Sequence, residues 1–216
     1  MSTLKNGKAI IFDFDGTIVD SMEAFADIAS EVIPKHYGTS KEEARKLYIK
    51  TSGLPFFQQL EQIFPDHPAN ATAAEEYENT KKKDYLDKPA FDDVLSAIEE
   101  LKKHGIKTIV SSNNFQELVD THVDKIGVQF DMVLGFKENF AKGEDHFAHI
   151  EDALKIRRDE MIFVGDSIKD GERAKTSGIS FIGREGTFDA SDFKREFPEV
   201  TTISTLSELK NIITGD

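Results

Sequence analysis

The chain has 216 residues, contains no cysteine and carries a formal net charge of −13 at pH 7. The lack of cysteine excludes disulfides and thiolate metal sites, and the acidic balance argues against nucleic acid and anionic membranes as partners. No apolar segment has the length of a membrane span, and the first residues lack a signal-peptide core, so we expect a cytoplasmic protein.

Five short apolar runs, each rich in Ile, Val and Phe, predict β-strands. The expected strands are residues 8–14, 106–111, 130–136, 161–164 and 179–183. Between them, apolar residues at helical spacing predict helices at 91–104, 115–126 and 146–156. Alternating strands and helices are typical of an α/β fold with a doubly wound, mostly parallel sheet.

One region interrupts this alternation, because residues 21–87 show helical patterns and no strand. We therefore expect a small all-helical cap domain of residues 21–87, inserted into an α/β core domain of residues 1–20 and 88–216. Its expected helices, the first ended by Pro34, are 22–33, 41–50, 56–64 and 71–86. The aromatic side chains expected in its core are Tyr48, Phe56 and Phe57.

Polar residues follow four of the predicted strands. In chain order they are Asp13 and Asp15, then Ser111, then Lys142, and finally Asp166 with Asp170. Ligands of an open parallel sheet bind in the crevice outside the carboxyl ends of its strands. These residues are therefore expected to share one cleft, although they are far apart in the sequence.

The expected cleft holds more negative charge than one lysine can balance. At about 4 Å and an effective dielectric of about 20, each pair of carboxylates costs roughly 4 kcal/mol. Lys142 alone does not offset several such pairs, whereas a hard divalent cation does. Oxygen-only ligands, completed by water and phosphate oxygens, indicate Mg²⁺ rather than Zn²⁺.

Phosphoryl transfer is the chemistry that uses these groups. Asp13 is the candidate nucleophile and would form an aspartyl-phosphate, while Asp15 would give and take protons. Mg²⁺, Lys142 and Ser111 would hold the phosphate oxygens. Gly16 and Thr17 are expected at the phosphate too, Gly16 by letting the backbone turn and Thr17 with its hydroxyl on Asp15.

The motifs resemble those of the haloacid dehalogenase superfamily, in the phosphatase branch with a helical cap after the first motif. The matching residues, in the order of the four motifs, are Asp13-Phe14-Asp15-Gly16-Thr17, Ser111, Lys142, and Gly165-Asp166-Ser167 with Asp170. The resemblance implies a Rossmann-like core and a metal held by Asp13, the backbone carbonyl of Asp15, and Asp166. Under this resemblance, Asp170 either binds the metal directly or contacts the metal's ligands without binding it.

For several residues near the motifs, the sequence allows more than one role. Ser112 adjoins Ser111 and is expected to offer its backbone amide to phosphate. Asn113 is a candidate substrate contact, although Asn113 and Asn114 also suit the start of the next helix. Lys137 competes with Lys142 for the third motif.

Two further sets of residues are candidate ligands. His146 and His149, three residues apart on a predicted helix, are a weaker candidate for a metal pair. In the cap, the turn at 51–55 resembles a specificity loop, and Lys50, Ser52 and Gly53 are its candidate substrate contacts.

We therefore expect a Mg²⁺-dependent phosphate monoester hydrolase that acts on a small phosphorylated metabolite, such as phosphoglycolate or a sugar phosphate. Asp15 argues against dehalogenation, which needs no proton-donating second acid. A sugar-phosphate mutase and a non-catalytic phosphate-binding module remain the alternatives. The expected assembly is a monomer or a weak homodimer.

Overall fold

A computed structural model of the protein describes residues 7–215. The chain divides into two units, one formed by the residues up to Val19 and from Ala90 onward, the other by Asp20–Pro89. These junctions lie within two residues of the boundaries expected from the sequence. Where the chain leaves and re-enters the first unit, Val19 and Ala90 pair through an isolated antiparallel bridge.

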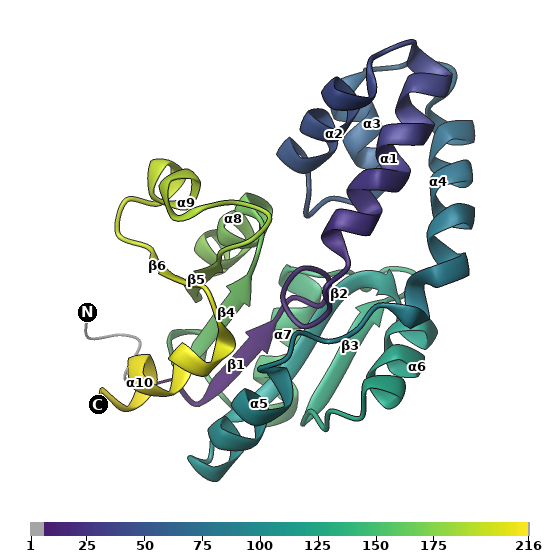
Figure 1. Ribbon diagram of the computed structural model, residues 1–216. Coiled ribbons are helices and arrows are strands. Elements are labelled where there is room, and N and C mark those ends of the chain that lie inside the picture. Colours follow the sequence, from purple (N-terminus) through teal and green to yellow (C-terminus); the bar gives the residue numbers. More distant parts are fainter. Residues whose placement is uncertain (1–6, 216) are drawn as a thin grey trace. The chain divides into compact units, whose positions relative to one another are not determined.

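The first unit is built on one sheet, in which six strands within residues 7–215 all run parallel in the order β3-β2-β1-β4-β5-β6 (Figure 1). The strands are β1 (Ala9–Phe12), β2 (Lys107–Phe115), β3 (Met132–Phe136), β4 (Met161–Gly165), β5 (Ser180–Arg184) and β6 (Thr201–Ile203). Strand β1 lies centrally because its apolar residues are buried on both faces.

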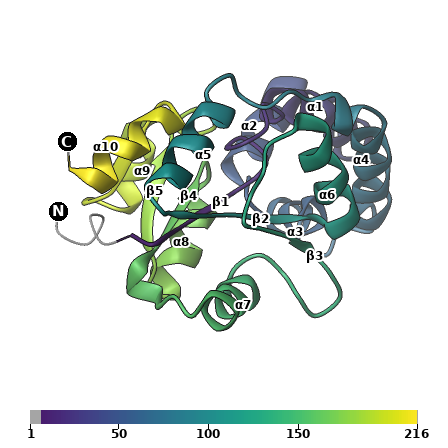
Figure 2. The same cartoon turned by 90° about the horizontal axis from the view of Figure 1, so that it is seen from below.

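Helices cover both faces of this sheet (Figure 2). On one face lie α5 (Val94–Lys103), α6 (Gln116–Ile126) and α10 (Leu209–Thr214); on the other lie α7 (Glu144–Leu154) and α8 (Ile168–Thr176). The unit also contains α9 (Ala190–Glu196) and the short 3₁₀ helices η3 (Arg158–Glu160) and η4 (Leu206–Glu208). The expected doubly wound α/β fold is confirmed.

A buried cluster fixes α7 against the sheet. Phe147 and Ile150 of α7 pack in one apolar core with Ile11 of β1, Ile109 of β2 and Phe163 of β4. Since these three strands are neighbours in register, with Ile11 opposite both Ile109 and Phe163, their carboxyl ends meet at one edge. The start of α7 lies at that same edge.

Two strands differ most from the sequence prediction, while the bounds of the others shift by one or two residues. Strand β2 was expected to end at Ser111 but continues to Phe115, with a shift of register against β3 between these residues. The bulge has no apolar alternation to reveal it, because the inserted residues are Ser and Asn. Strand β6 was not expected, since three residues with one buried side chain carry too short a pattern.

The secondary-structure elements of the second unit, Asp20–Pro89, are all helices. Its elements are α1 (Met22–Tyr37), α2 (Lys41–Lys50), α3 (Phe56–Ile63), α4 (Asn70–Asp84) and the 3₁₀ helix η2 (Tyr85–Asp87). Helix α1 was expected to end before Pro34 but runs on to Tyr37, where Gly38 closes it at φ 70°. Pro34 lacks a backbone N–H and costs the helix one hydrogen bond, yet the three residues after it stay helical up to the Gly38 cap.

An aromatic group forms part of this unit's core. The rings of Phe56 and Tyr77 stack at 3.9 Å between centroids, and the hydroxyls of Tyr48 and Tyr77 are 2.9 Å apart. Tyr48 and Phe56 are buried as expected, but the prediction for Phe57 is wrong, because its side chain is 46% exposed. On an eight-residue helix only one of two adjacent aromatics faces the core.

Within residues 7–215, the helices are all too short or too polar to cross a bilayer.

Candidate active site

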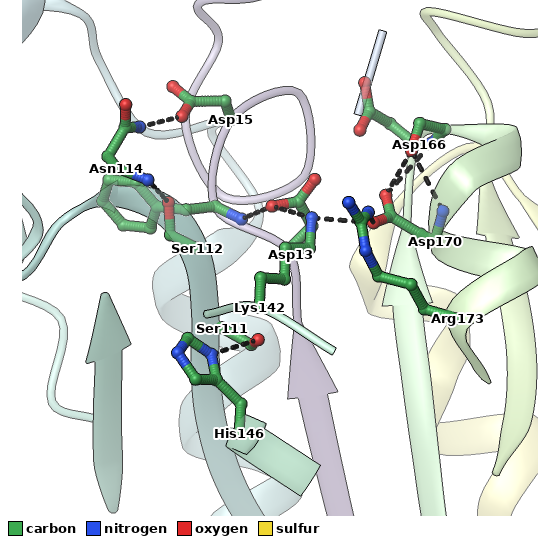
Figure 3. A network of polar contacts seen from close by, with 12 residues as sticks. Asp13, Asp15, Ser111, Ser112, Asn114, Lys142, His146, Asp166, Asp170 and Arg173 are labelled. Atoms are coloured by element: carbon green, nitrogen blue, oxygen red, sulfur yellow. Dashed lines mark hydrogen bonds and ion pairs between the residues drawn. The ribbon is translucent and has the colours of Figure 1, made fainter. Parts of the chain in front are cut away.

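Asp13 comes directly after β1 and is almost fully buried. Its backbone N–H donates to the carbonyl of Val164 in β4, at 2.8 Å, which holds the residue at the sheet edge. One oxygen of its carboxylate accepts the N–H of Phe14 at 2.6 Å and the ammonium of Lys142 at 2.8 Å (Figure 3). The Asp13 side chain is therefore held in one orientation by its own turn and by a lysine from a distant segment.

Lys142 lies between two carboxylates. Its Nζ is 2.8 Å from Asp13 and 2.7 Å from Asp170, and all three side chains are buried. The next residue, Gly143, has φ 118°, a conformation that L side chains rarely adopt, and α7 follows immediately. This turn sends the Lys142 side chain toward the acids while the backbone starts the helix.

Asp166 and Asp170 stand at the junction of β4 and α8. The Ser167 side chain caps α8 by accepting the Asp170 N–H, and the Asp170 carboxylate accepts the Ser167 N–H and hydroxyl in return. This capping box binds Asp170 to the helix start. Gly165 makes room for it, since a Cβ there would lie 2.6 Å from the Asp170 carboxylate. Asp166 accepts a hydrogen bond from the Thr187 hydroxyl.

Three buried carboxylates gather here, because Asp13, Asp166 and Asp170 each offer an oxygen within 4.8 Å of the others. Burial raises the pKa of Asp13 well above its ordinary value, although Lys142 opposes the shift. Burial, and then the charge of Asp170, raises the pKa of Asp166 to about 7. Burial acts on Asp170 too, but Lys142 and Arg173 outweigh it and the pKa of Asp170 lies below its ordinary value.

The cations beside the acids do not balance them. Burial lowers the pKa of Lys142, but Asp13 and Asp170 outweigh this effect and raise it, so Lys142 is charged. Arg173 lies 3.3 Å from Asp170. Two cations thus face three carboxylates, and two of these carboxylates hold their protons more tightly than usual. A buried oxygen-only set with too little positive charge to ionise all its carboxylates fits a hard divalent cation such as Mg²⁺.

Asp15 lies on the turn that leaves β1, half-buried and away from the three-acid cluster in Figure 3. Its carboxylate accepts a hydrogen bond from the side-chain amide of Asn114, in the bulged part of β2. Gly16 follows at φ 75° and donates its N–H to Val19 at 2.8 Å. The Gly16 carbonyl accepts from Arg184, whose guanidinium lies 3.7 Å above the Phe91 ring. The turn is thereby held from both sides.

Ser111 and Ser112 are both buried but face different partners. The Oγ of Ser111 is 2.8 Å from the Nδ1 of His146 in α7. The Oγ of Ser112 accepts the backbone N–H of Asn114 at 3.1 Å, and Asn113 between them is half-buried. Strand alternation places Ser111 on the face of α7 and Lys142, as the sequence favoured, whereas Ser112 supports the bulge.

His146 is a buried residue beside Ser111. Burial lowers the pKa of His146 to about 4; the charge of Lys142 acts in the same direction and the backbone of Gly135 opposes it. The ring packs against Phe140, with 4.6 Å between centroids. His149 instead lies edge-on to Phe140, exposed on the same helix. Among residues 7–215, the group of three or more side chains placed to hold a metal consists of Asp13, Asp166 and Asp170, so the candidate pair of His146 and His149 lacks a third ligand.

Most of the predicted site residues from the α/β unit come together here. Within the described residues, Asp13, Ser111, Lys142, Asp166 and Asp170 line one edge of the sheet, with Asp15 on the adjoining turn (Figure 3). Gly16 follows Asp15 in that turn. Lys137 does not compete, since its Nζ lies 5.9 Å above Phe140. The predicted bond from Thr17 to Asp15 is wrong. The Thr17 hydroxyl is buried and makes no hydrogen bond within residues 7–215.

The remaining candidates belong to the helical unit. Lys50 is exposed at the end of α2, Ser52 is buried in the turn that follows, and Gly53 has φ 88°. That these three residues contact substrate stays a prediction.

Four side chains of the site escaped the sequence analysis as partners of the motif residues: Asn114 on Asp15, Thr187 on Asp166, Arg173 on Asp170 and His146 on Ser111. A signal existed for Arg173, because it follows Asp170 by three residues on one helix. The other three pairs join segments between 21 and 99 residues apart, and no local pattern marks them.

Known proteins resemble this chain over most of its length. The haloacid dehalogenase-like hydrolase family model matches residues 10–184. The chain is 22% identical over 212 residues to pyrophosphatase PpaX of Halalkalibacterium halodurans, covering 94% of this chain and 95% of that one. It is 28% identical over 181 residues to phosphoglycolate phosphatase of Aquifex aeolicus, covering 79% and 81%. A haloacid dehalogenase-like hydrolase from Streptococcus pneumoniae has the same fold, with TM-score 0.79, 20% identity and coverage of 95% and 98%.

The buried His146 is expected to weaken the fold in mild acid. Its folded-state pKa of about 4 lies below the value of about 6.5 in an unfolded chain, so between these pH values only the unfolded state binds the proton. Stability should therefore fall as pH drops from about 6.5 to about 4, by at most about 3 kcal/mol from this residue. Urea denaturation across this range should show a shallower pH dependence for His146→Asn.

His149→Asn is the matched control, because His149 is exposed on the same helix. If His146→Asn and the wild type lost stability in parallel on acidification, His146 would not be a buried neutral group.

Proposed function

The chain belongs to the haloacid dehalogenase-like hydrolase family, and on this premise we propose that it is a phosphatase for a small phosphorylated metabolite. The observation that carries the proposal is the buried Asp13 carboxylate, oriented by Lys142 at the sheet edge beside Asp166 and Asp170. A carboxylate so placed suits nucleophilic attack on phosphorus, because its orientation is set before substrate arrives.

In the first half of the proposed reaction, an oxygen of Asp13 attacks the substrate phosphorus. The bond from phosphorus to the ester oxygen breaks, and Asp15 gives its proton to that oxygen. The products of this step are the free alcohol and an aspartyl-phosphate on Asp13. The Lys142 ammonium, which contacts Asp13 in the absence of substrate, also counters the negative charge of the phosphoryl oxygens.

In the second half, Asp15 takes a proton from water, and the water oxygen attacks the phosphorus of the aspartyl-phosphate. The bond between phosphorus and Asp13 breaks, inorganic phosphate leaves, and both carboxyl groups return to their starting states. Asn114 orients Asp15 for both proton transfers through its amide hydrogen bond. Asp15 suits this exchange because it is only half-buried and stands apart from the three-acid cluster.

The residues that would hold Mg²⁺ are Asp13, Asp166 and Asp170, together with the backbone carbonyl of Asp15 that the family resemblance implies. A bound Mg²⁺ supplies positive charge to the phosphate oxygens and offsets the repulsion among the carboxylates. Thr187 orients Asp166 for this role by a hydrogen bond to one of its oxygens.

The relatives' names support phosphate chemistry but differ in substrate. One is a pyrophosphatase and another a phosphoglycolate phosphatase. A phosphoanhydride is therefore the second candidate substrate beside a phosphate monoester, because the match to the pyrophosphatase spans nearly the full length of both chains. A sugar-phosphate mutase would use the same Asp13 and Asp15 but release little phosphate.

Replacing Asp13 by Asn should abolish turnover, because an amide oxygen is a poor nucleophile. We expect kcat for an aryl phosphate to fall by about a thousandfold or more. Phosphate release should be measured for both proteins on a panel of aryl phosphate, phosphoglycolate, sugar phosphates and pyrophosphate, with Asp152→Asn as an exposed control on α7. Equal rates for wild type and Asp13→Asn would sink the nucleophile assignment, and a wild type inactive on the whole panel would sink the phosphatase proposal.

Removal of metal should stop the reaction. Chelation with EDTA is expected to abolish hydrolysis, and added Mg²⁺ should restore it. Asp166→Asn should raise the Mg²⁺ concentration for half-maximal rate by about tenfold or more, because it removes a charged ligand. A rate that persists in EDTA, or an unchanged Mg²⁺ requirement in Asp166→Asn, would contradict the assignment of the three-acid cluster.

The proton-donating role of Asp15 predicts a dependence on the leaving group. A basic alkoxide needs the proton of Asp15, whereas a weakly basic phenolate leaves without one. Asp15→Asn should therefore reduce kcat/KM for an alkyl phosphate by about tenfold or more beyond its effect on an aryl phosphate. Equal losses for the two substrates would rule out this role.

A further inference from the structure

A buried hydrogen bond joins the second motif to the helix that follows the third. The Oγ of Ser111 and the Nδ1 of His146 are 2.8 Å apart, and both side chains are fully buried. Ser111 belongs to β2 and His146 to α7, so the bond crosses from the sheet to the covering helix (Figure 3). None of the catalytic roles described above uses His146.

The same stretch of chain supplies Lys142 and His146. Lys142 reaches Asp13 from just before α7, and His146 reaches Ser111 from the first turn of that helix. Phe147, the next residue, is packed in the core against Phe163 at 5.3 Å between ring centroids. The helix start is therefore fixed, and with it the positions of both polar side chains.

The hydrogen-bond direction between Ser111 and His146 decides what Ser111 can do. At neutral pH the His146 ring is uncharged, since burial lowers its pKa to about 4, and it carries one N–H. If Ser111 donated its only hydrogen to Nδ1, that hydrogen would be lost to a phosphate oxygen. If Nδ1–H donates to Ser111, the serine hydrogen stays available.

The surroundings of the ring favour the second direction. The other ring nitrogen, Nε2, is buried and makes no hydrogen bond within the described residues. A buried N–H without an acceptor is rarer in proteins than an under-used acceptor, because the lost donor bond is not replaced. The ring hydrogen therefore belongs on Nδ1, where the Ser111 oxygen accepts it.

We propose that His146 is a positioning residue, whose Nδ1–H donates to Ser111 Oγ and so directs the Ser111 hydroxyl hydrogen toward a phosphoryl oxygen held at Asp13. The proposal rests on the proposed phosphatase function for the identity of the acceptor. Its effect is exerted through Ser111, because the neighbours of the His146 ring are the serine, Phe140 and the backbone of Gly135 rather than the acids.

The first test is a double-mutant cycle. His146→Leu keeps similar bulk without a hydrogen bond, and His146→Asn places an amide N–H near the Nδ1 position. We expect His146→Leu to lower kcat/KM for an aryl phosphate by about tenfold and to weaken inhibition by inorganic phosphate, whereas His146→Asn retains most activity. In a Ser111→Ala background, His146→Leu should change neither quantity further.

The outcomes separate a positioning role from a structural one. Equal losses from His146→Leu in the presence and absence of the Ser111 hydroxyl would overturn the proposal, as would full activity of His146→Leu. His149→Leu is the matched control on the same helix, because His149 is exposed and does not contact Ser111; its activity should equal that of the wild type.

The second test needs no turnover and no foldable leucine variant. The ¹⁵N chemical shifts of histidine rings in the wild-type protein report which nitrogen carries hydrogen, and the His146 signals are assigned by their absence in His146→Asn. A ring protonated at Nδ1 supports the proposal, and one protonated only at Nε2 overturns it. If the wild type hydrolysed nothing on the panel, the phosphatase proposal would fail while this measurement still decided the hydrogen-bond direction.

Discussion

The interaction on which the site depends is the double ion pair of Lys142. Its ammonium lies 2.8 Å from Asp13 and 2.7 Å from Asp170, with all three groups buried. Buried charges are stable only when they are paired, so each member of this group requires the others. Since Asp13 follows β1, Asp170 begins α8 and Lys142 precedes α7, one ammonium joins three segments that are far apart in the chain. Loss of Lys142 would leave Asp13 without its cation and Asp170 with Arg173 alone.

The same cluster explains why the site suits a cation in addition to Lys142. The pKa of Asp170 is lowered by the charges of Lys142 and Arg173. The pKa values of Asp13 and Asp166 are instead raised, chiefly by burial. A nucleophilic carboxylate has to be ionised. The fold therefore provides the orientation of Asp13 but only part of the positive charge that its ionisation needs, and the proposed Mg²⁺ supplies the remainder.

The chain segment that begins α7 has a second consequence. It places Lys142 on Asp13, just after β1, and His146 on Ser111, within β2. Asp13 and Ser111 directly follow Phe12 and Val110, which lie opposite each other in the two neighbouring strands. A single helix start thereby sets the orientation of two groups that the proposed reaction needs, and the apolar packing of Phe147 holds that start in place. The geometry of the site therefore depends directly on the packing of the core.

Much of this protein was determined by its sequence alone. The alternation of apolar runs and helical patterns predicted the parallel α/β sheet, and the helix at Lys41–Lys50 has the predicted bounds. The acids at Asp13, Asp166 and Asp170 were predictable as one cluster because the carboxyl ends of parallel strands share an edge. These are local patterns, or consequences of topology, and each can be derived without coordinates.

Only the tertiary structure decided which side chains are the hydrogen-bond partners of the motif residues. Asn114, rather than Thr17, bonds to Asp15, because the bulge in β2 turns the asparagine toward the first strand's turn. His146, considered for a metal, is instead bonded to Ser111 because α7 packs at that height against the sheet. Such contacts depend on the register of strands and helices that are distant in sequence, and a shift of one residue would replace every partner. The sequence thus determined which groups are candidates for the proposed chemistry, and packing determined how they are oriented.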